Sequence, residues 1–300
     1  MIILRITVAI FAAMFAANVA AVYPDRPIRI LVPFAAAGVA DILARVVAQK
    51  ITEQTGKTVI VENKTGAGGR IGYEAGAKSA SDGYTFVATD VTYTMMPALY
   101  PTLPWTHSDL VPVALLAQMP FVIAVRESSK VSALSHIVAS AKADPKKLNY
   151  GSAGIGSVNH VVTELFERTA GINMTNVPYR GMGEAMTGLL GGSVDVLITA
   201  MPTAMSQLKG GKIVALGVTA PQRATALPNI PTTAEAGVPF IASNWIGLTA
   251  HKNKPNEAVD WMHKSVAAAV GALEVKERFI AQGAEPSGIG ADEFGRLMQS

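Results

Sequence analysis

The chain has 300 residues, half of them hydrophobic, a formal net charge of +3 and no cysteine. The absence of cysteine excludes disulfides, thiolate metal sites and cysteine nucleophiles. The basic residues are scattered rather than gathered into a stripe with interleaved aromatic residues, so the electrostatic pattern of a nucleic-acid-binding protein is missing.

Residues 1–21 have the pattern of a secretory signal peptide. Arg5 is their only charged residue, residues 6–15 form an apolar core, and Val19-Ala20-Ala21 supplies the small residues of a cleavage site. The apolar segment is too short and wrongly flanked for a membrane-spanning helix, and we favour a leader over a buried N-terminal helix. We therefore expect export to the periplasm and cleavage near Ala21, which also suits a cysteine-free protein of this size.

Strand-like and helix-like segments alternate along the remaining chain. The earlier units comprise a strand at 28–34, a helix ending at Gly56, a strand at 58–62, a helix around 75–77 and a strand at 84–88. The later units comprise a strand at 121–125, a helix at 132–143, and strands at 174–179, 194–199, 213–218 and 245–250. This alternation predicts an α/β protein with largely parallel sheets.

A segment rich in proline and polar residues, 221–239, interrupts this pattern and is interpreted as a return linker. We therefore expect two lobes, each long enough to bury its own core. The first would comprise residues 22–120 plus 221–300, and the second residues 121–220.

Two loops that each open a helix have the features of anion-binding sites. In the first, the small residues 35–40 separate a strand from the helix that starts near Asp41. In the second, glycines at 151, 154 and 156 let an anion approach the backbone, and Ser152 and Ser157 supply hydroxyls. The first N–H groups of a helix lack intrahelical partners and carry partial positive charge. Two such loops predict a ligand with anionic or polar ends, held between two halves of the protein.

Motifs of other function classes fail at particular residues. The segment 66–72 nearly matches a dinucleotide-binding fingerprint, but Ile71 stands where the third glycine is required. A nucleophile elbow around Ser152 would need glycine at the position of Tyr150. The five histidines show no metal-ligand spacing, so we expect no metal, no nucleotide cofactor and no serine-hydrolase chemistry.

Four polar residues near these loops admit two roles each. His160 either packs behind the second loop or contacts the ligand, and Asp41 either caps its helix or positions the ligand. Asp195 either holds a loop together or contacts the ligand. Arg180, in the strand-to-helix loop 177–183, is either solvated or paired with a carboxylate.

A series of short motifs, in order and at matching spacing, resembles the solute-binding proteins of tripartite tricarboxylate transporters, known as the Bug family. The motifs lie at 23–29, 61–69, 82–85, 99–105, 148–157, 177–181, 189–195 and 231–237. Together they span nearly the whole chain after the leader.

The resemblance implies a two-lobed periplasmic binding protein fold (type II-like), in which each lobe is a mixed, largely parallel sheet flanked by helices. It implies a monomeric binding protein, without enzymatic activity or cofactor, that captures a small carboxylate and delivers it to integral-membrane transporter subunits. The carboxylate would be a di- or tricarboxylate or an aromatic acid. The alternative from another class is an adaptor that presents the loaded protein to a membrane sensor.

The family's two binding loops map onto residues 33–41 and 152–160. The first would hold the carboxylate largely through ordered water, and the second through backbone N–H groups and hydroxyls. The ligand-binding residues implied in this way, with Arg180 and Asp195 added from the neighbouring loops, are Phe34, Ala37, Gly38, Asp41, Ser152, Ala153, Gly156, Ser157, His160, Arg180 and Asp195.

The chain departs from the family pattern at two places. Ala37 replaces a glycine of the first loop, and we expect that loop to use ordinary backbone angles, with Gly38 as the one permissive position. The chain also ends at Ser300, inside what the family pattern makes a longer C-terminal helix.

Overall fold

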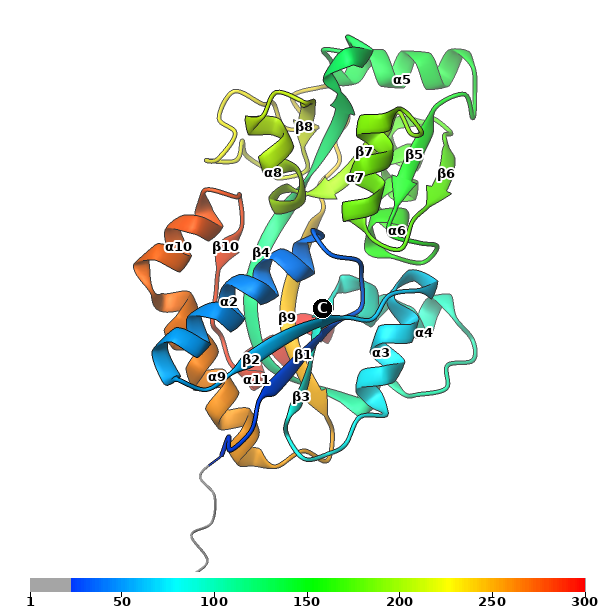
Figure 1. Ribbon diagram of the computed structural model, residues 1–300. Helices are drawn as coiled ribbons and strands as arrows, with labels where there is room; N and C mark the ends of the chain where they lie inside the picture. Colours follow the sequence, from blue (N-terminus) through cyan, green and yellow to red (C-terminus); the bar gives the residue numbers. More distant parts are fainter. Residues whose placement is uncertain (1–22, 300) are drawn as a thin grey trace, which may run out of the picture.

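The computed structural model describes residues 23–299, which fold into two α/β lobes. Figure 1 shows the lobes one above the other, with strand β4 (Leu110–Arg126) running through both. The expected signal peptide and its cleavage site lie outside the described residues. Among residues 23–299, no helix is both long enough and apolar enough to cross a membrane.

Lobe 1 is a sheet in the order β2-β1-β3-β9-β4, with β10 on the far side of β4. Its other strands are β1 (Ile28–Val32), β2 (Val59–Asn63), β3 (Thr85–Asp90), β9 (Ser243–His251) and β10 (Glu285–Pro286). Strand β1 is parallel to β2 and β3, whereas β9 is antiparallel to β3 and β4.

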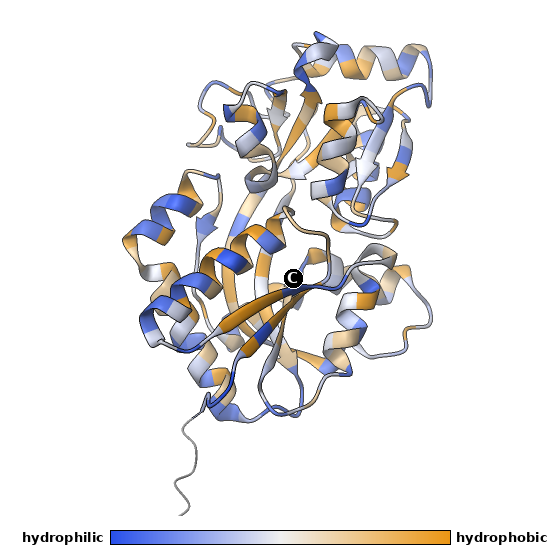
Figure 2. Cartoon of the chain, viewed as in Figure 1, coloured by the Kyte–Doolittle hydropathy of each residue, from blue (hydrophilic) through white to orange (hydrophobic). Residues whose placement is uncertain are grey.

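Helices cover both faces of this sheet. One face packs against α2 (Val39–Thr55), α9 (Asn256–Gly271) and α10 (Leu273–Ile280). The other face packs against α3 (Arg70–Ala77), α4 (Val91–Leu99) and α11 (Ala291–Gln299). Successive residues of a strand point to opposite faces, so β1 sends Ile30 into one core and Leu31 into the other. Figure 2 shows the resulting concentration of hydrophobic residues on the strands.

Lobe 2 continues the sheet in the order β4-β7-β5-β6, with β8 also paired to β4. Its strands are β5 (Asn149–Ser152), β6 (Thr175–Pro178), β7 (Val196–Ala200) and β8 (Ile213–Val218). Helices α7 (Met182–Gly191) and α8 (Met201–Lys209) cover one face, and α5 (Leu134–Ala143) and α6 (Val158–Ala170) cover the other.

Single 3-10 turns lie at η1 (Ala67–Gly69), η2 (His107–Asp109) and η3 (Glu127–Ser129).

Both sheets are mixed, and the parallel pairs arise from the expected α/β alternation. Every antiparallel pair among the named strands involves β4 or β9. The strand expected to begin at residue 121 is longer, because residues 110–120 pair with β9 before residues 121–124 pair with β7. The apolar run from 110 to 125 contains no turn signal strong enough to separate the two halves of β4.

The segment 221–242 packs against lobe 2. Ala224 and Leu227 contact one of its cores, and the ring of Phe240 lies 5.8 Å from that of Phe166 on α6. The division of the chain into lobes at 120/121 and 220/221 stays a prediction. Because residues 221–242 pack against lobe 2, we favour a boundary at which the chain returns to lobe 1 between Ala242 and Ser243.

Candidate ligand-binding site

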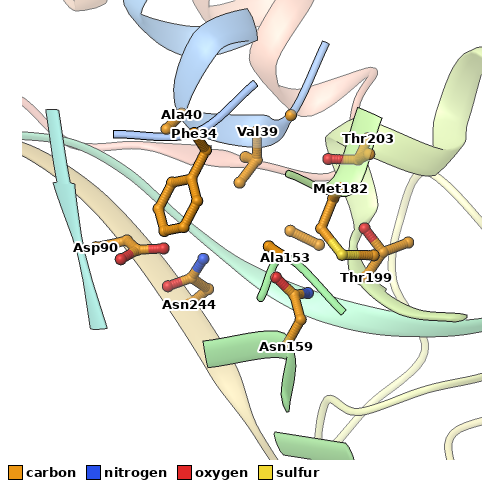
Figure 3. A pocket seen from close by; sticks show the side chains of 12 residues that line it. Phe34, Val39, Ala40, Asp90, Ala153, Asn159, Met182, Thr199, Thr203 and Asn244 are labelled. Atoms are coloured by element: carbon orange, nitrogen blue, oxygen red, sulfur yellow. The ribbon is translucent and has the colours of Figure 1, made fainter. Parts of the chain in front are cut away.

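A cavity lies between the lobes, where strands β1, β3 and β7 end. Lobe 1 contributes Phe34, Gly38, Val39, Ala40, Asp90 and Asn244, and lobe 2 contributes Ala153, Asn159, Met182, Thr199, Ala200 and Thr203 (Figure 3). It encloses about 360 Å³ of space free of atoms, part of it open to solvent. The carboxyl ends of strands at a lobe junction are where α/β folds usually bind ligands.

Five of the described helices begin at residues that line this cavity. The N-cap positions of α2, α4 and α8 are Gly38, Asp90 and Ala200, and the first turns of α6 and α7 hold Asn159 and Met182. Helix N-termini carry unpaired N–H groups and partial positive charge, so several that converge on one cavity favour an anion. The sequence predicted three of these helix starts, those of α2 and α6 and, after the strand-to-helix loop 177–183, that of α7.

Three buried hydroxyls at the cavity form no hydrogen bond within the described part of the chain. They belong to Ser152, Thr199 and Thr203, of which the two threonines line the cavity and Ser152 immediately precedes Ala153. A buried hydroxyl without a partner costs about 1–3 kcal/mol, so such groups usually mark a place where a ligand or water binds.

Two asparagine amides complete the polar lining. The Asn159 Nδ2 atom donates to the carbonyl oxygen of Ile198 at 2.9 Å, which leaves its Oδ1 atom to other partners. The Asn244 Oδ1 atom accepts from the backbone N–H of Trp245 at 3.0 Å, which leaves its amide nitrogen to other partners. Figure 3 shows that amide beside Asp90 at one side of the cavity.

The first loop differs from its expected geometry at Ala37. This residue has φ = 63°, in the left-handed region, whereas Gly38 has an ordinary extended conformation with φ = −76°. The expectation that Gly38 is the permissive position is therefore wrong. The turn at Ala37 lets its N–H donate to Asp41 Oδ2 at 3.1 Å. That hydrogen bond offsets part of the roughly 1–2 kcal/mol that an L-residue loses in this conformation.

Asp41 holds the first loop in place from outside the cavity. Its Oδ1 atom accepts from Arg45 Nε and from Asn63 Nδ2, each at 2.9 Å. Burial acts to raise the pKa of Asp41, but the donors on Arg45, Asn63 and Ala37 outweigh it and lower the pKa. The geometry therefore gives Asp41 the role of positioning the loop, whereas the two roles considered from the sequence were helix capping and ligand positioning.

The second loop forms the N-terminus of α6. Ser157 is the N-cap residue of this helix, and its Oγ atom accepts from the backbone N–H of His160 at 3.3 Å. The His160 Nδ1 atom accepts from the N–H of Gly156 at 3.4 Å, and its ring stacks on Tyr150 at 6.5 Å. Gly156, Ser157 and His160 therefore shape the loop without lining the cavity.

Arg180 and Asp195 also lie outside the cavity. The Arg180 side chain is 73% exposed and forms an ion pair with Glu184 at 2.9 Å. Asp195 accepts a hydrogen bond from the backbone N–H of Asn149 at 2.9 Å, so it ties the start of β5 to the start of β7. Neither side chain reaches the lining, because each is held by a partner on its own lobe.

The two lobes touch around the cavity. The N–H of Ala35 donates to the Arg180 carbonyl oxygen at 3.3 Å, and the N–H of Val158 donates to Thr92 Oγ1 at 2.9 Å. Gly183 approaches the first loop so closely that a Cβ atom there would lie 2.1 Å from the Ala36 carbonyl oxygen. This arrangement is a closed conformation, in which loops of each lobe contact the other lobe.

Sequence reasoning missed three lining residues inside the two loops and all six outside them. The three are Val39, Ala40 and Asn159, and the six are Asp90, Met182, Thr199, Ala200, Thr203 and Asn244. Asp90 and Thr199 do carry a recognisable signal, because a polar residue at the carboxyl end of a buried strand faces the lobe junction. Asn244 carries no such signal, since its position depends on where β9 begins.

Comparisons with known proteins agree with this architecture. The model of the tripartite tricarboxylate transporter family receptor matches residues 43–300. Protein BugT of Bordetella pertussis is 36% identical over 268 residues, which are 88% of this chain and 82% of that protein. The solved structure of MatC from Rhodopseudomonas palustris with bound malate is 30% identical, with a TM-score of 0.87 over 92% of this chain and 96% of that chain. A structure of an R. palustris protein with adipate is 32% identical, with a TM-score of 0.88 over 92% of this chain and 94% of that chain.

Proposed function

The chain belongs to the tripartite tricarboxylate transporter receptor family, and on that premise we propose that it captures a small carboxylate between its lobes. It then delivers the carboxylate to the integral-membrane subunits of such a transporter. The protein works in the periplasm, after cleavage of its leader near Ala21, and as a monomer. Malate and adipate, bound by two structural relatives, exemplify the ligand class.

The observation that carries this proposal is the convergence on one cavity between the lobes of four helix N-termini with uncharged N-cap residues, those of α2, α6, α7 and α8. Backbone N–H groups and helix dipoles bind a carboxylate without a cationic side chain. The free hydroxyls of Thr199 and Thr203, which line the cavity, supply further donors. Closure of the lobes removes the bound anion from water and so strengthens each of these hydrogen bonds.

We propose that each of the two loops contains residues with a direct role in binding and residues with an indirect one. Phe34, Gly38 and Ala153 contact the ligand directly, because they line the cavity. Ala37, Asp41, Gly156, Ser157 and His160 act by holding the loops in their binding conformation.

We propose binding without chemistry. Within residues 23–299, neither of the lining hydroxyls of Thr199 and Thr203 is hydrogen bonded to a base that would activate it. A nucleophilic hydroxyl needs such a base within hydrogen-bond reach.

Calorimetry with di- and tricarboxylates and aromatic acids tests the proposal. We expect at least one acid to bind, and Thr199→Val and Thr203→Val to weaken that binding by about 1.5–3 kcal/mol each, the range for a hydrogen bond to a charged group. Thr187→Val is the matched control, because Thr187 is exposed on α7 and lies away from the cavity lining. Failure of every acid to bind, or equal losses in all three variants, would contradict the proposal.

A further inference from the structure

Asp90 is, within the described part of the chain, the sole ionisable side chain that lines the cavity. It ends β3, is 4% exposed, and lies beside the amide of Asn244 (Figure 3). Thr199 and Thr203 lie at the opposite side of the same view. The cavity therefore has one side with hydroxyl donors and another with a carboxylate.

The structural hydrogen bonds of Asp90 do not require its negative charge. Its Oδ1 atom accepts from the Tyr73 hydroxyl at 2.8 Å and from the backbone N–H of Thr92 at 3.0 Å, which caps α4. An asparagine in the same place would supply the same carbonyl oxygen to both donors. Its cap would be about as good, because aspartate and asparagine rank together at the N-cap.

The charge is, on the contrary, unfavourable in this environment. Burial raises the pKa of Asp90 to about 6, even though neutral donors on Tyr73, Thr92 and Asn244 act to lower it. At neutral pH the group is thus a desolvated carboxylate compensated only by neutral donors. A costly group at a binding site is usually retained because the ligand needs it.

A ligand with carboxylates at both ends would bring a like charge to this side of the cavity. Two anions that share a desolvated site repel each other, whereas an opposite charge compensates the buried one. The helix dipole of α4 gives little help to a second anion, because Asp90 already occupies its N-terminus.

We propose that the ligand is a zwitterionic carboxylate, such as an amino acid, and that Asp90 and Asn244 receive its protonated nitrogen. This inference rests on the proposed function and narrows its ligand class. The carboxylate of the ligand lies toward Thr199, Thr203 and the helix N-termini of lobe 2. Its ammonium group donates hydrogen bonds to Asp90, and Asn244 holds the aspartate in position.

Matched acids that share a carbon skeleton test the inference by calorimetry at pH 7.5. One series is aspartate, malate and succinate, a second is glutamate, 2-hydroxyglutarate and glutarate, and a third is alanine, lactate and propionate. In at least one series we expect the amino acid to bind about ten- to hundredfold more tightly than both partners, as a hydrogen bond between charged groups predicts. Tighter binding of the hydroxy or unsubstituted acid would overturn the inference while leaving carboxylate capture intact.

The variant Asp90→Asn then separates recognition from structure. We expect it to weaken binding of the preferred amino acid at least tenfold while the unsubstituted acid binds as well as before or better. Glu167→Gln is the matched control, because Glu167 is also a buried acid with a raised pKa but lies on α6 away from the cavity lining. An equal loss for both acids in Asp90→Asn would show a purely structural role. Failure of every acid to bind the wild-type protein would instead contradict the proposed function itself.

Discussion

The free energy of unfolding of Asp90→Asn, relative to wild type, should depend on pH. The burial of the Asp90 carboxyl in the wild-type protein determines the direction of that dependence. In the folded protein the pKa of Asp90 is raised from 3.8 to about 6. A folded-state pKa above the unfolded value means that the contribution of Asp90 to stability is fully present below about pH 4 and is lost as the pH rises through 6. A shift of about two pKa units corresponds to roughly 3 kcal/mol at pH 7.

The asparagine variant has no ionisable group at this position, so its stability is not lowered as the pH rises through 6. We therefore expect its free energy of unfolding, relative to wild type, to rise by up to about 3 kcal/mol between pH 4 and pH 7. Any pH-independent effect of the amide cancels in that difference. Urea unfolding of both proteins without ligand, followed by circular dichroism at several pH values, measures it. An unchanged difference between pH 4 and pH 7, or a fall, would refute the account of Asp90 as a buried carboxylate with neutral donors alone to compensate its charge.

Four substitutions in the loops test the remaining geometry. Ala37→Gly should raise the free energy of unfolding by about 0.5–1 kcal/mol in thermal or urea unfolding, because relief of the left-handed strain exceeds the added flexibility of glycine. Gly38→Ala should cost less than about 1 kcal/mol of stability in urea unfolding, because its φ is ordinary and its Cβ would lie 3.5 Å from the Ala35 carbonyl oxygen. Gly183→Ala should leave the fold intact but weaken binding at least about tenfold, because its Cβ would meet the Ala36 carbonyl oxygen and hold the lobes apart; unchanged affinity would show that closure is not required. Ser157→Ala should cost about 1 kcal/mol of stability through the lost cap of α6, and a loss confined to affinity would show direct ligand contact instead.

Sequence patterns predicted the fold well where local chemistry decides the structure. The helix expected to end at Gly56 does so, because that glycine adopts a left-handed C-cap with φ = 68°. The strand at 213–218 has its expected bounds, since an apolar run is flanked there by glycine and polar residues. The strand at 110–120 was missed because its pairing partner, β9, lies more than a hundred residues away in the sequence.

The candidate site was predicted only in part for the same reason. Phe34, Gly38 and Ala153 belong to loops with a recognisable composition, and all three line the cavity. Asp90 and Asn244 come together only when β3 pairs with β9, a contact that no local pattern announces. The error at Ala37 has another cause: a hydrogen bond to Asp41 fixes the backbone, and composition alone favours the neighbouring glycine.

A crystal structure of the protein with its tightest-binding acid tests the central claim most directly. The account predicts closed lobes, with a carboxylate of the ligand within hydrogen-bond distance of the Thr199 or Thr203 hydroxyl and of backbone N–H groups at the helix N-termini. A ligand bound outside this cavity, or inside it with its carboxylate facing away from both hydroxyls and every helix N-terminus, would contradict the account.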